Sequence, residues 1–308
     1  MASWRRAGKG AEMFAILVLA AIASAGCDAA GPVEFEPEVV VEGYLRAGGR
    51  LPSIRVSRTI ELDATYTPHG TAITDAMVSI HLLNESGERE ESVEYRSSDA
   101  SPGSYVPVFS SGEPTFALPL RTYELQVDVP DGPEPIRATT LVPDTFSVVR
   151  TGADSVVYQA SKQFSFLVSS TTYPGRQNVF VFTTLALDGR PGQLTPFAES
   201  LIEGELSVDD LRERASPILN EDNFEHVQND FLRIRFPWLA IYFYGRNQIS
   251  VSALDDNLYD FIRSQMVQQG GSTLPPGEIP NILERVEGGR GVFGSYARAS
   301  TFFYVLRP

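Results

Sequence analysis

A single cysteine, Cys27, is the residue in this chain of 308 whose type and position point to a chemical modification. It follows three small residues, Ser24, Ala25 and Gly26, which a signal peptidase accommodates. Upstream lie a basic start and an apolar run over residues 13–25. These features are typical of a secretory signal peptide, because the run of 13 residues is shorter than the roughly 20 that a membrane-spanning helix needs.

The end of this segment resembles a bacterial lipoprotein signal. The resemblance implies a signal peptide over residues 1–26, cleavage between Gly26 and Cys27, and acylation of Cys27 with chains such as palmitate. Two acyl chains hold a protein stably on a membrane. The alternative is a soluble secreted protein cut at the Ala25–Gly26 site, which would leave an unpaired thiol near its new terminus.

A second motif with possible chemistry is the run Gly289-Arg290-Gly291-Val292-Phe293-Gly294, which satisfies the G-x-G-x-x-G pattern of dinucleotide-binding turns. That function needs a helix after the motif and an acidic residue about 20 positions later. Here 14 residues follow, and they have the pattern of a strand. We therefore expect no cofactor, and a glycine-rich turn that permits positive φ and close backbone packing before the last strand.

The histidines and the nucleophilic residues of the chain give little indication of a metal site or a catalytic nucleophile. His69, His81 and His226 lie far apart without the spacing of metal ligands, so no metal site is expected. His81 alternates with apolar neighbours and is placed on the polar face of its strand. The nucleophile elbow G-x-S-x-G is absent, and lipidation would consume the cysteine.

Three pairs of adjacent acids could supply the two carboxylates of a glycoside hydrolase: Asp209-Asp210, Glu221-Asp222 and Asp255-Asp256. Sequence neighbours do not by themselves face each other across a cleft, and helix capping explains these acids more simply. No catalytic residue is assigned. Trp238, Tyr242 and Tyr244 could stack on a ligand, although aromatic residues in strands more often belong to a core.

The net charge of the chain limits the classes of partner that are expected. The net charge is −14, and removal of residues 1–26, which carry +2, leaves −16 on a chain of 282 residues. Such a negative field repels nucleic acid and anionic lipid surfaces, so neither is an expected partner.

The fold is predicted to be mainly β. Residues 27–38, with glycine, prolines and acids, form a tether. Over residues 39–143 about seven short alternating runs separated by turns predict an immunoglobulin-like β-sandwich. One of these runs, residues 78–82, forms a hairpin with residues 93–96.

Residues 144–308 are predicted to form a second β-rich domain. A run apolar on both faces over residues 178–187 indicates a buried strand, and a similar run over 300–306 predicts a C-terminal strand internal to a sheet. Two helices are expected, near residues 207–215, after a capping-box pattern, and near 255–269, which should pack on the second sheet.

The chain resembles a family of bacterial lipoproteins known as domain of unknown function 4249. The likeness extends over nearly the whole mature chain. It rests on residues 39–45, 55–58, 76–80 followed by Gly87, 250–254 with 259–261, and 288–294. The family motif at the last of these comprises Gly288, Gly289, Gly291, Phe293 and Gly294, and the resemblance assigns no role to it. The family resemblance implies a Bacteroidota-type cell-envelope lipoprotein, often associated with TonB-dependent outer-membrane receptors.

The expected function is therefore that of a non-enzymatic outer-membrane lipoprotein, held on the membrane by the lipid on Cys27, which assists a TonB-dependent nutrient transporter or binds its ligand. Two alternatives stay open. One is a structural or adhesive surface module, and the other is a polysaccharide hydrolase with a carboxylate pair.

Overall fold

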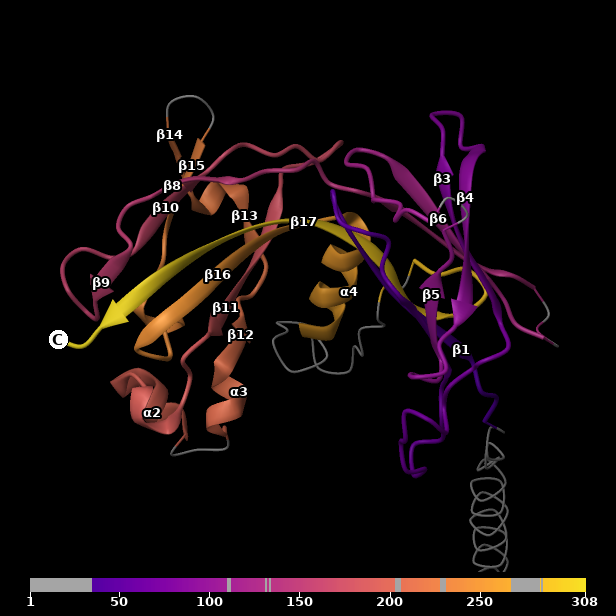
Figure 1. The fold of residues 1–308 in the computed structure, drawn as a ribbon, viewed down its shortest axis with the longest axis horizontal. Helices are drawn as coiled ribbons and strands as arrows, with labels where there is room; N and C mark the ends of the chain where they lie inside the picture. The colour runs from indigo at the N-terminus through magenta and orange to yellow at the C-terminus, as the bar shows by residue number, and fades with distance from the viewer. Residues whose placement is uncertain are drawn as a thin grey trace, which may run out of the picture. The chain divides into compact units, whose positions relative to one another are not determined.

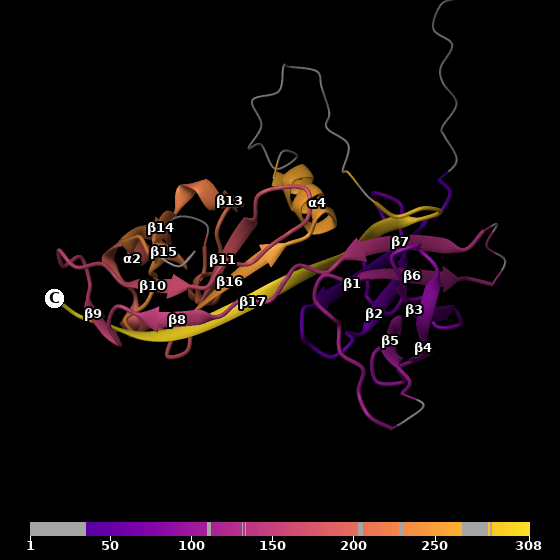
Figure 2. The ribbon, with the colours of Figure 1, turned by 90° about the horizontal axis from the view of Figure 1, so that it is seen from above.

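The described part of the computed structural model comprises residues 35–109, 112–130, 132, 134–202, 206–227, 231–266, 283 and 285–308 (Figures 1 and 2). The predicted signal peptide and Cys27 lie outside these residues. Of the predicted tether, residues 35–38 are described, and they are exposed and precede the first strand. Within the described ranges, no helix has both the length and the apolar character required to cross a membrane.

The elements are mostly short strands with a few short helices, which confirms the predicted mainly β, sandwich-like fold. In chain order they are β1 (Val39–Arg46), β2 (Ile54–Arg58), β3 (Met77–Leu83), β4 (Arg89–Ser97), β5 (Ser104–Pro107), β6 (Thr122–Asp128), β7 (Ile136–Leu141), β8 (Val148–Thr151), β9 (Ser155–Val157), β10 (Ser165–Val168), β11 (Val179–Ala186), α2 (Pro196–Ile202), α3 (Val208–Arg212), β12 (Glu213–Ala215), β13 (Leu219–Asn220), β14 (Glu225–Val227), β15 (Phe231–Arg235), β16 (Gly245–Leu254), α4 (Asp256–Met266) and β17 (Arg290–Leu306).

A large sheet carries most of these strands, in the order β12-β11-β16-β17-β1-β2-β5-β4-β3-β6-β7. The N-terminal half contains the predicted hairpin, because β3 and β4 pair antiparallel with Val78 opposite Tyr95. At the far end of the path, Thr140 of β7 lies 2.7 Å from Ser295 of β17, measured between their hydroxyl oxygens. The sheet therefore curls back on itself around a buried core of alternating apolar side chains.

A small sheet in the second half has the order β14-β15-β10-β8. It packs against β11, β16 and β17 through aromatic side chains, and the rings of Phe164 and Phe303 are stacked with centroids 4.2 Å apart. The predicted buried strand at residues 178–187 is β11, which pairs with β16 on one side and with β12 and β13 on the other.

The C-terminal strand β17 connects both halves, and it is drawn as the long yellow arrow in Figure 1. Its first part pairs parallel with β1, with Gly291 opposite Val41, and its remainder pairs antiparallel with β16. The strand is internal to the sheet, as predicted, but it begins at Arg290 rather than near residue 300. The half of the fold that was predicted over residues 39–143 thus contains a strand segment from the end of the chain. By their contacts, residues 38–308 form one compact unit.

The helices follow their local signals, with corrections to their bounds. Ser207 and Asp210 form the predicted capping box, but α3 ends at Arg212 because residues 213–215 extend to pair with β11 as β12. Helix α4 begins at Asp256 and packs on β17 with Leu258 buried. The predicted residues 267–269 of this helix lie outside the described part. Helix α2 was missed, although Thr195 before Pro196 is a start signal whose hydroxyl accepts from the Ala198 N–H at 3.3 Å.

Candidate functional site

The glycine motif lies at the join between β1, β17 and α4. Gly288 and Gly291 have φ values of 77° and 106°, which confirms the predicted positive φ. Gly291 and Gly294 lie in the strand β17, however, and not in a turn before it. A Cβ on Gly291 would lie 2.1 Å from the Val41 carbonyl oxygen, and one on Gly294 would lie 2.6 Å from the Leu258 side chain. These glycines therefore allow β1 and α4 to approach β17 closely.

The other members of this motif also have packing roles. A Cβ on Gly289 would lie 2.9 Å from the carbonyl oxygen of Val39, and Phe293 is buried in the core. The backbone carbonyl of Phe293 accepts a hydrogen bond of 2.6 Å from the Asn257 side chain of α4. The family motif thus supports the strand that joins the two halves.

His81 is buried rather than exposed on a polar face, which corrects the sequence-based expectation. Its Nδ1 lies 2.7 Å from the Ser92 hydroxyl and its Nε2 lies 3.0 Å from that of Ser79. Burial, with Arg89 nearby, lowers the pKa of His81 below its usual 6.5. Two serine partners satisfy both ring nitrogens, so this histidine is a structural residue of β3. Among the described residues, no three His, Cys, Asp or Glu side chains are placed to hold a metal ion.

The first two acid pairs have local structural partners. Asp210 accepts the Ser207 N–H at 2.8 Å in the capping box of α3, and Asp209 forms an ion pair with Arg212. Glu221 accepts from the Asn178 side chain at 2.8 Å. These carboxylates close helix ends and loops, and none of these contacts places two of them across a cleft.

In the third pair, Asp255-Asp256, one carboxylate is buried and the other is partly exposed. Asp256 forms an ion pair with Arg176, whereas Asp255 is 1% exposed. Asp255 accepts the Leu258 N–H at 2.9 Å, which caps α4, and the Thr140 hydroxyl of β7 at 2.5 Å. Desolvation is the main cause that raises the pKa of Asp255 to about 6, against the lowering effect of these hydrogen bonds.

Replacing Asp255 with asparagine should remove a pH dependence of stability. Because the pKa of Asp255 is raised from 3.8 to about 6 on folding, the folded protein binds this proton more tightly than the unfolded chain. The stabilisation from protonation is complete below about pH 4 and is lost as the pH rises through 6, a change of about 3 kcal/mol. Urea unfolding between pH 4.5 and 7.5 should show this slope in the wild type and lack it in D255N. The exposed control D209N should keep the wild-type slope; an equal slope in D255N would contradict the assignment.

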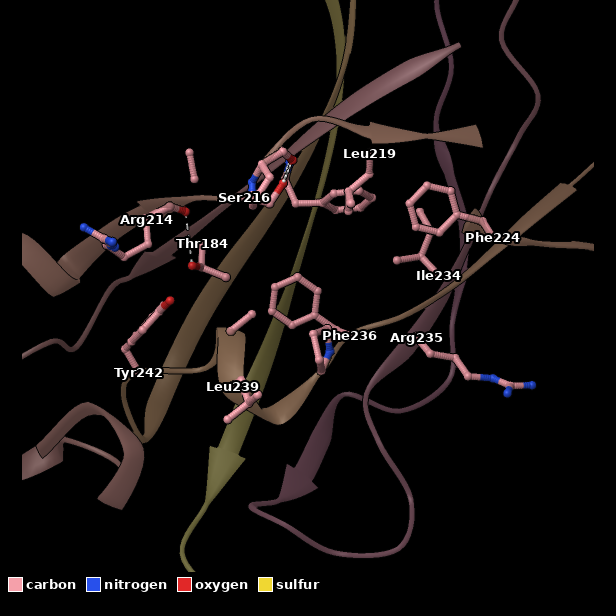
Figure 3. A pocket seen from close by; sticks show the side chains of 15 residues that line it. Thr184, Arg214, Ser216, Leu219, Phe224, Ile234, Arg235, Phe236, Leu239 and Tyr242 are labelled. Carbon is pink, nitrogen blue, oxygen red and sulfur yellow. Dashed lines mark hydrogen bonds between the residues drawn. The ribbon is translucent and has the colours of Figure 1, made fainter. Parts of the chain in front are cut away.

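A pocket of about 340 Å³ lies between the two sheets in the second half of the chain (Figure 3). Its walls come from β11 and β12 of the large sheet, from β15 of the small sheet and from the turn at residues 237–242. Apolar side chains form most of the wall, and Leu239, with 64% of its surface exposed, lies at the rim. A mostly apolar cavity with a few polar groups is the usual form of a small-molecule site.

The polar groups of the pocket are not spread evenly. Figure 3 shows Thr184, Arg214 and Tyr242 toward one end, whereas Phe224, Ile234 and Arg235 lie toward the other. The Thr184 hydroxyl donates to the Arg214 carbonyl at 3.4 Å, which is a long bond. The pocket therefore has an apolar body, with two hydroxyl groups and Arg214 at one end. Arg235 is at the other end, where its side chain extends away from the pocket in Figure 3.

Sequence reasoning missed this pocket as a whole but included one of its residues. Tyr242 was a candidate for ligand stacking, and it lines the pocket. Trp238 and Tyr244 instead pack edge-on against Tyr158, as expected of core aromatics. No spacing in the sequence relates Arg214 of β12 to the strand β15, so no sequence signal brings these walls together.

Comparison with solved structures finds distant likenesses. Trypsin-activated alpha-2-macroglobulin from Escherichia coli matches 88% of this chain with 11% identity and a TM-score of 0.23, and the chain spans 16% of that protein. A tetra-tandem repeat in the extending region of a large adhesion protein matches 87% of this chain with 10% identity and a TM-score of 0.23, and 49% of that chain is covered. Similarity at this level supports no inference about function.

Comparison of sequences is more informative about the family. None of the curated proteins is significantly similar to this chain. A family model described as "Domain of unknown function (DUF4249)" matches residues 28–301, which include nearly all of the structure described above and the glycine motif. The chain therefore belongs to the DUF4249 family.

Proposed function

We propose that this protein is a non-enzymatic, lipid-anchored binding protein of the outer membrane that holds a small, largely apolar ligand for a TonB-dependent nutrient transporter. The observation that carries the proposal is the pocket of about 340 Å³ between the two sheets. Its volume is at the lower end of the range of about 300–1,000 Å³ for ligand sites. Binding is favoured over catalysis because the acids singled out from the sequence have structural partners.

The membrane and partner parts of the proposal are supported by the lipoprotein-like signal that ends at Cys27 and by family membership. Detergent extraction of the lipidated protein, followed by mass spectrometry of co-purified proteins, tests them. A TonB-dependent barrel in near-equal amount is expected. Recovery of the protein alone would contradict the transport role and favour a structural or adhesive surface module.

Filling the pocket should abolish binding of a small apolar probe. Ala240 lines the pocket, and a phenylalanine at this position would occupy part of the cavity. A ligand that binds the folded state raises the melting temperature, so octanol should stabilise the wild type and not A240F. The exposed loop variant A100F should respond like the wild type. If A240F is too unstable to measure, L239E at the exposed rim supplies the same comparison; equal stabilisation of wild type and variant would contradict the pocket as the site.

A further inference from the structure

The two arginines that line the pocket differ in their ion pairing. Arg235 forms an ion pair of 2.8 Å with Glu225, whose other carboxylate oxygen pairs with Arg233. Arg214 takes part in none of the ion pairs formed by the described residues, and its charge acts on Asp210 at longer range. The carboxylate of Asp210 is itself engaged by the N–H and hydroxyl of Ser207, at 2.8 and 2.6 Å. Of the two pocket arginines, Arg214 is thus the one that has no ion pair with a carboxylate of the described residues.

A hydroxyl donor accompanies this cation. Tyr242 is half-buried, and its ring contacts Phe197. Its hydroxyl forms no hydrogen bond with another residue of the described part of the chain. In Figure 3 the hydroxyl of Tyr242 points toward Thr184, on the side of the pocket where Arg214 lies. A guanidinium and a phenol provide N–H and O–H donors, which are the groups that a carboxylate accepts from.

The rest of the wall suits an apolar chain. Phe236, Ile234 and Phe182 are each at least 96% buried, and together with Phe224 they form an apolar surface away from Tyr242. Burial of methylene groups against such a surface contributes about 0.8 kcal/mol for each group. A ligand that fills the pocket would therefore have an apolar body and an acceptor at one end.

The charge at the site decides between kinds of anion. At the Arg214 end of the pocket, the one arginine without an ion pair among the described residues can balance one negative charge. The net charge of −14 on the whole chain opposes binding of multiply charged anions. We propose that the pocket binds an amphipathic monocarboxylate, with its carboxylate at Arg214 and Tyr242 and its apolar body against Phe236, Ile234 and Phe182. This assignment rests on the proposed function and names the ligand class of the same site.

Calorimetric titration with three eight-carbon probes tests the assignment: octanoate, octanol and octylamine. The wild type should bind octanoate more tightly than octanol, because only the carboxylate carries a charge opposite to that of the Arg214 guanidinium. Octylamine should bind weakest, because its ammonium carries the same charge as the guanidinium. R214Q should weaken octanoate binding by about tenfold or more and leave octanol binding unchanged. Y242F should weaken octanoate by a smaller factor. The matched control R235Q removes the arginine that is already paired with Glu225 and should bind octanoate like the wild type.

The outcomes separate this inference from the proposed function. Equal affinity for octanoate and octanol, or unchanged octanoate binding in R214Q, would overturn the carboxylate assignment while the pocket still binds an apolar ligand. Binding of none of the three probes would overturn the ligand-binding function itself. A loss of octanoate affinity in R235Q equal to that in R214Q would show general electrostatic attraction rather than recognition at one end, and would also overturn the assignment.

Discussion

Replacement of Gly291 with alanine is expected to destabilise the fold by about 2–6 kcal/mol. The residue has φ of 106°, and its Cβ would lie 2.1 Å from the carbonyl oxygen of Val41 in the neighbouring strand β1. A non-glycine residue at such a φ costs about 1–3 kcal/mol, and overpacking adds about 1–3 kcal/mol. The clash is with backbone, so it is relieved only by separating β1 from β17. Urea unfolding followed by circular dichroism measures the loss.

Gly87 offers a matched control for this prediction. It has φ of 80° in the turn between β3 and β4, and a Cβ there would have no atom within 4 Å. G87A should therefore cost only the conformational part, about 1–2 kcal/mol. If G291A were no more destabilising than G87A, the close approach of β1 to β17 at this position would be wrong.

Truncation of Phe303 to alanine is expected to cost about 3–5 kcal/mol. Its side chain is 3% exposed and stacks on Phe164, which directly precedes β10 of the small sheet, with ring centroids 4.2 Å apart. The truncation would leave a cavity between the two sheets that the paired strands β16 and β17 cannot close. The free energy of unfolding from urea titration at neutral pH is the measurement.

The adjacent residue Phe302 is the control, because it has the same side chain on the opposite face of the same strand. It is 60% exposed. F302A should change the free energy of unfolding by about 0.5 kcal/mol or less. Similar losses for both variants would mean that the C-terminal strand buries both faces, as its sequence suggested, rather than one.

The comparison at β17 shows where pattern reasoning succeeded and where it stopped. A run apolar on both faces correctly predicted that this strand is internal to a sheet. It did not predict that residues 290–296 pair with β1, because a ladder between segments some 250 residues apart leaves no periodic signal in either. The sequence indicated that the glycines there need positive φ. Only the positions of β1 and α4 explain why there is no space for a side chain at Gly291 and Gly294.

Buried polar groups illustrate the same limit. His81 alternates with apolar neighbours, and alternation alone placed it on a polar face, yet β3 lies between β4 and β6 and is covered on both faces. Asp255 looked like one of two helix-capping acids. The cap is real, but the raised pKa follows from enclosure by β7, β17 and α4, which come from distant parts of the chain.

The sequence by itself determined the mainly β class, the hairpin of β3 and β4, the capping box of α3 and the internal position of the last strand. Each depends on residues close together in the chain, where strand periodicity and capping chemistry operate. The tertiary structure alone decided the pairing of β17 with β1, the burial of Asp255 and the pocket with Arg214 and Tyr242 at one end. Those features arise where separate segments meet, because burial and unpaired charge are properties of the space between elements and not of any one element.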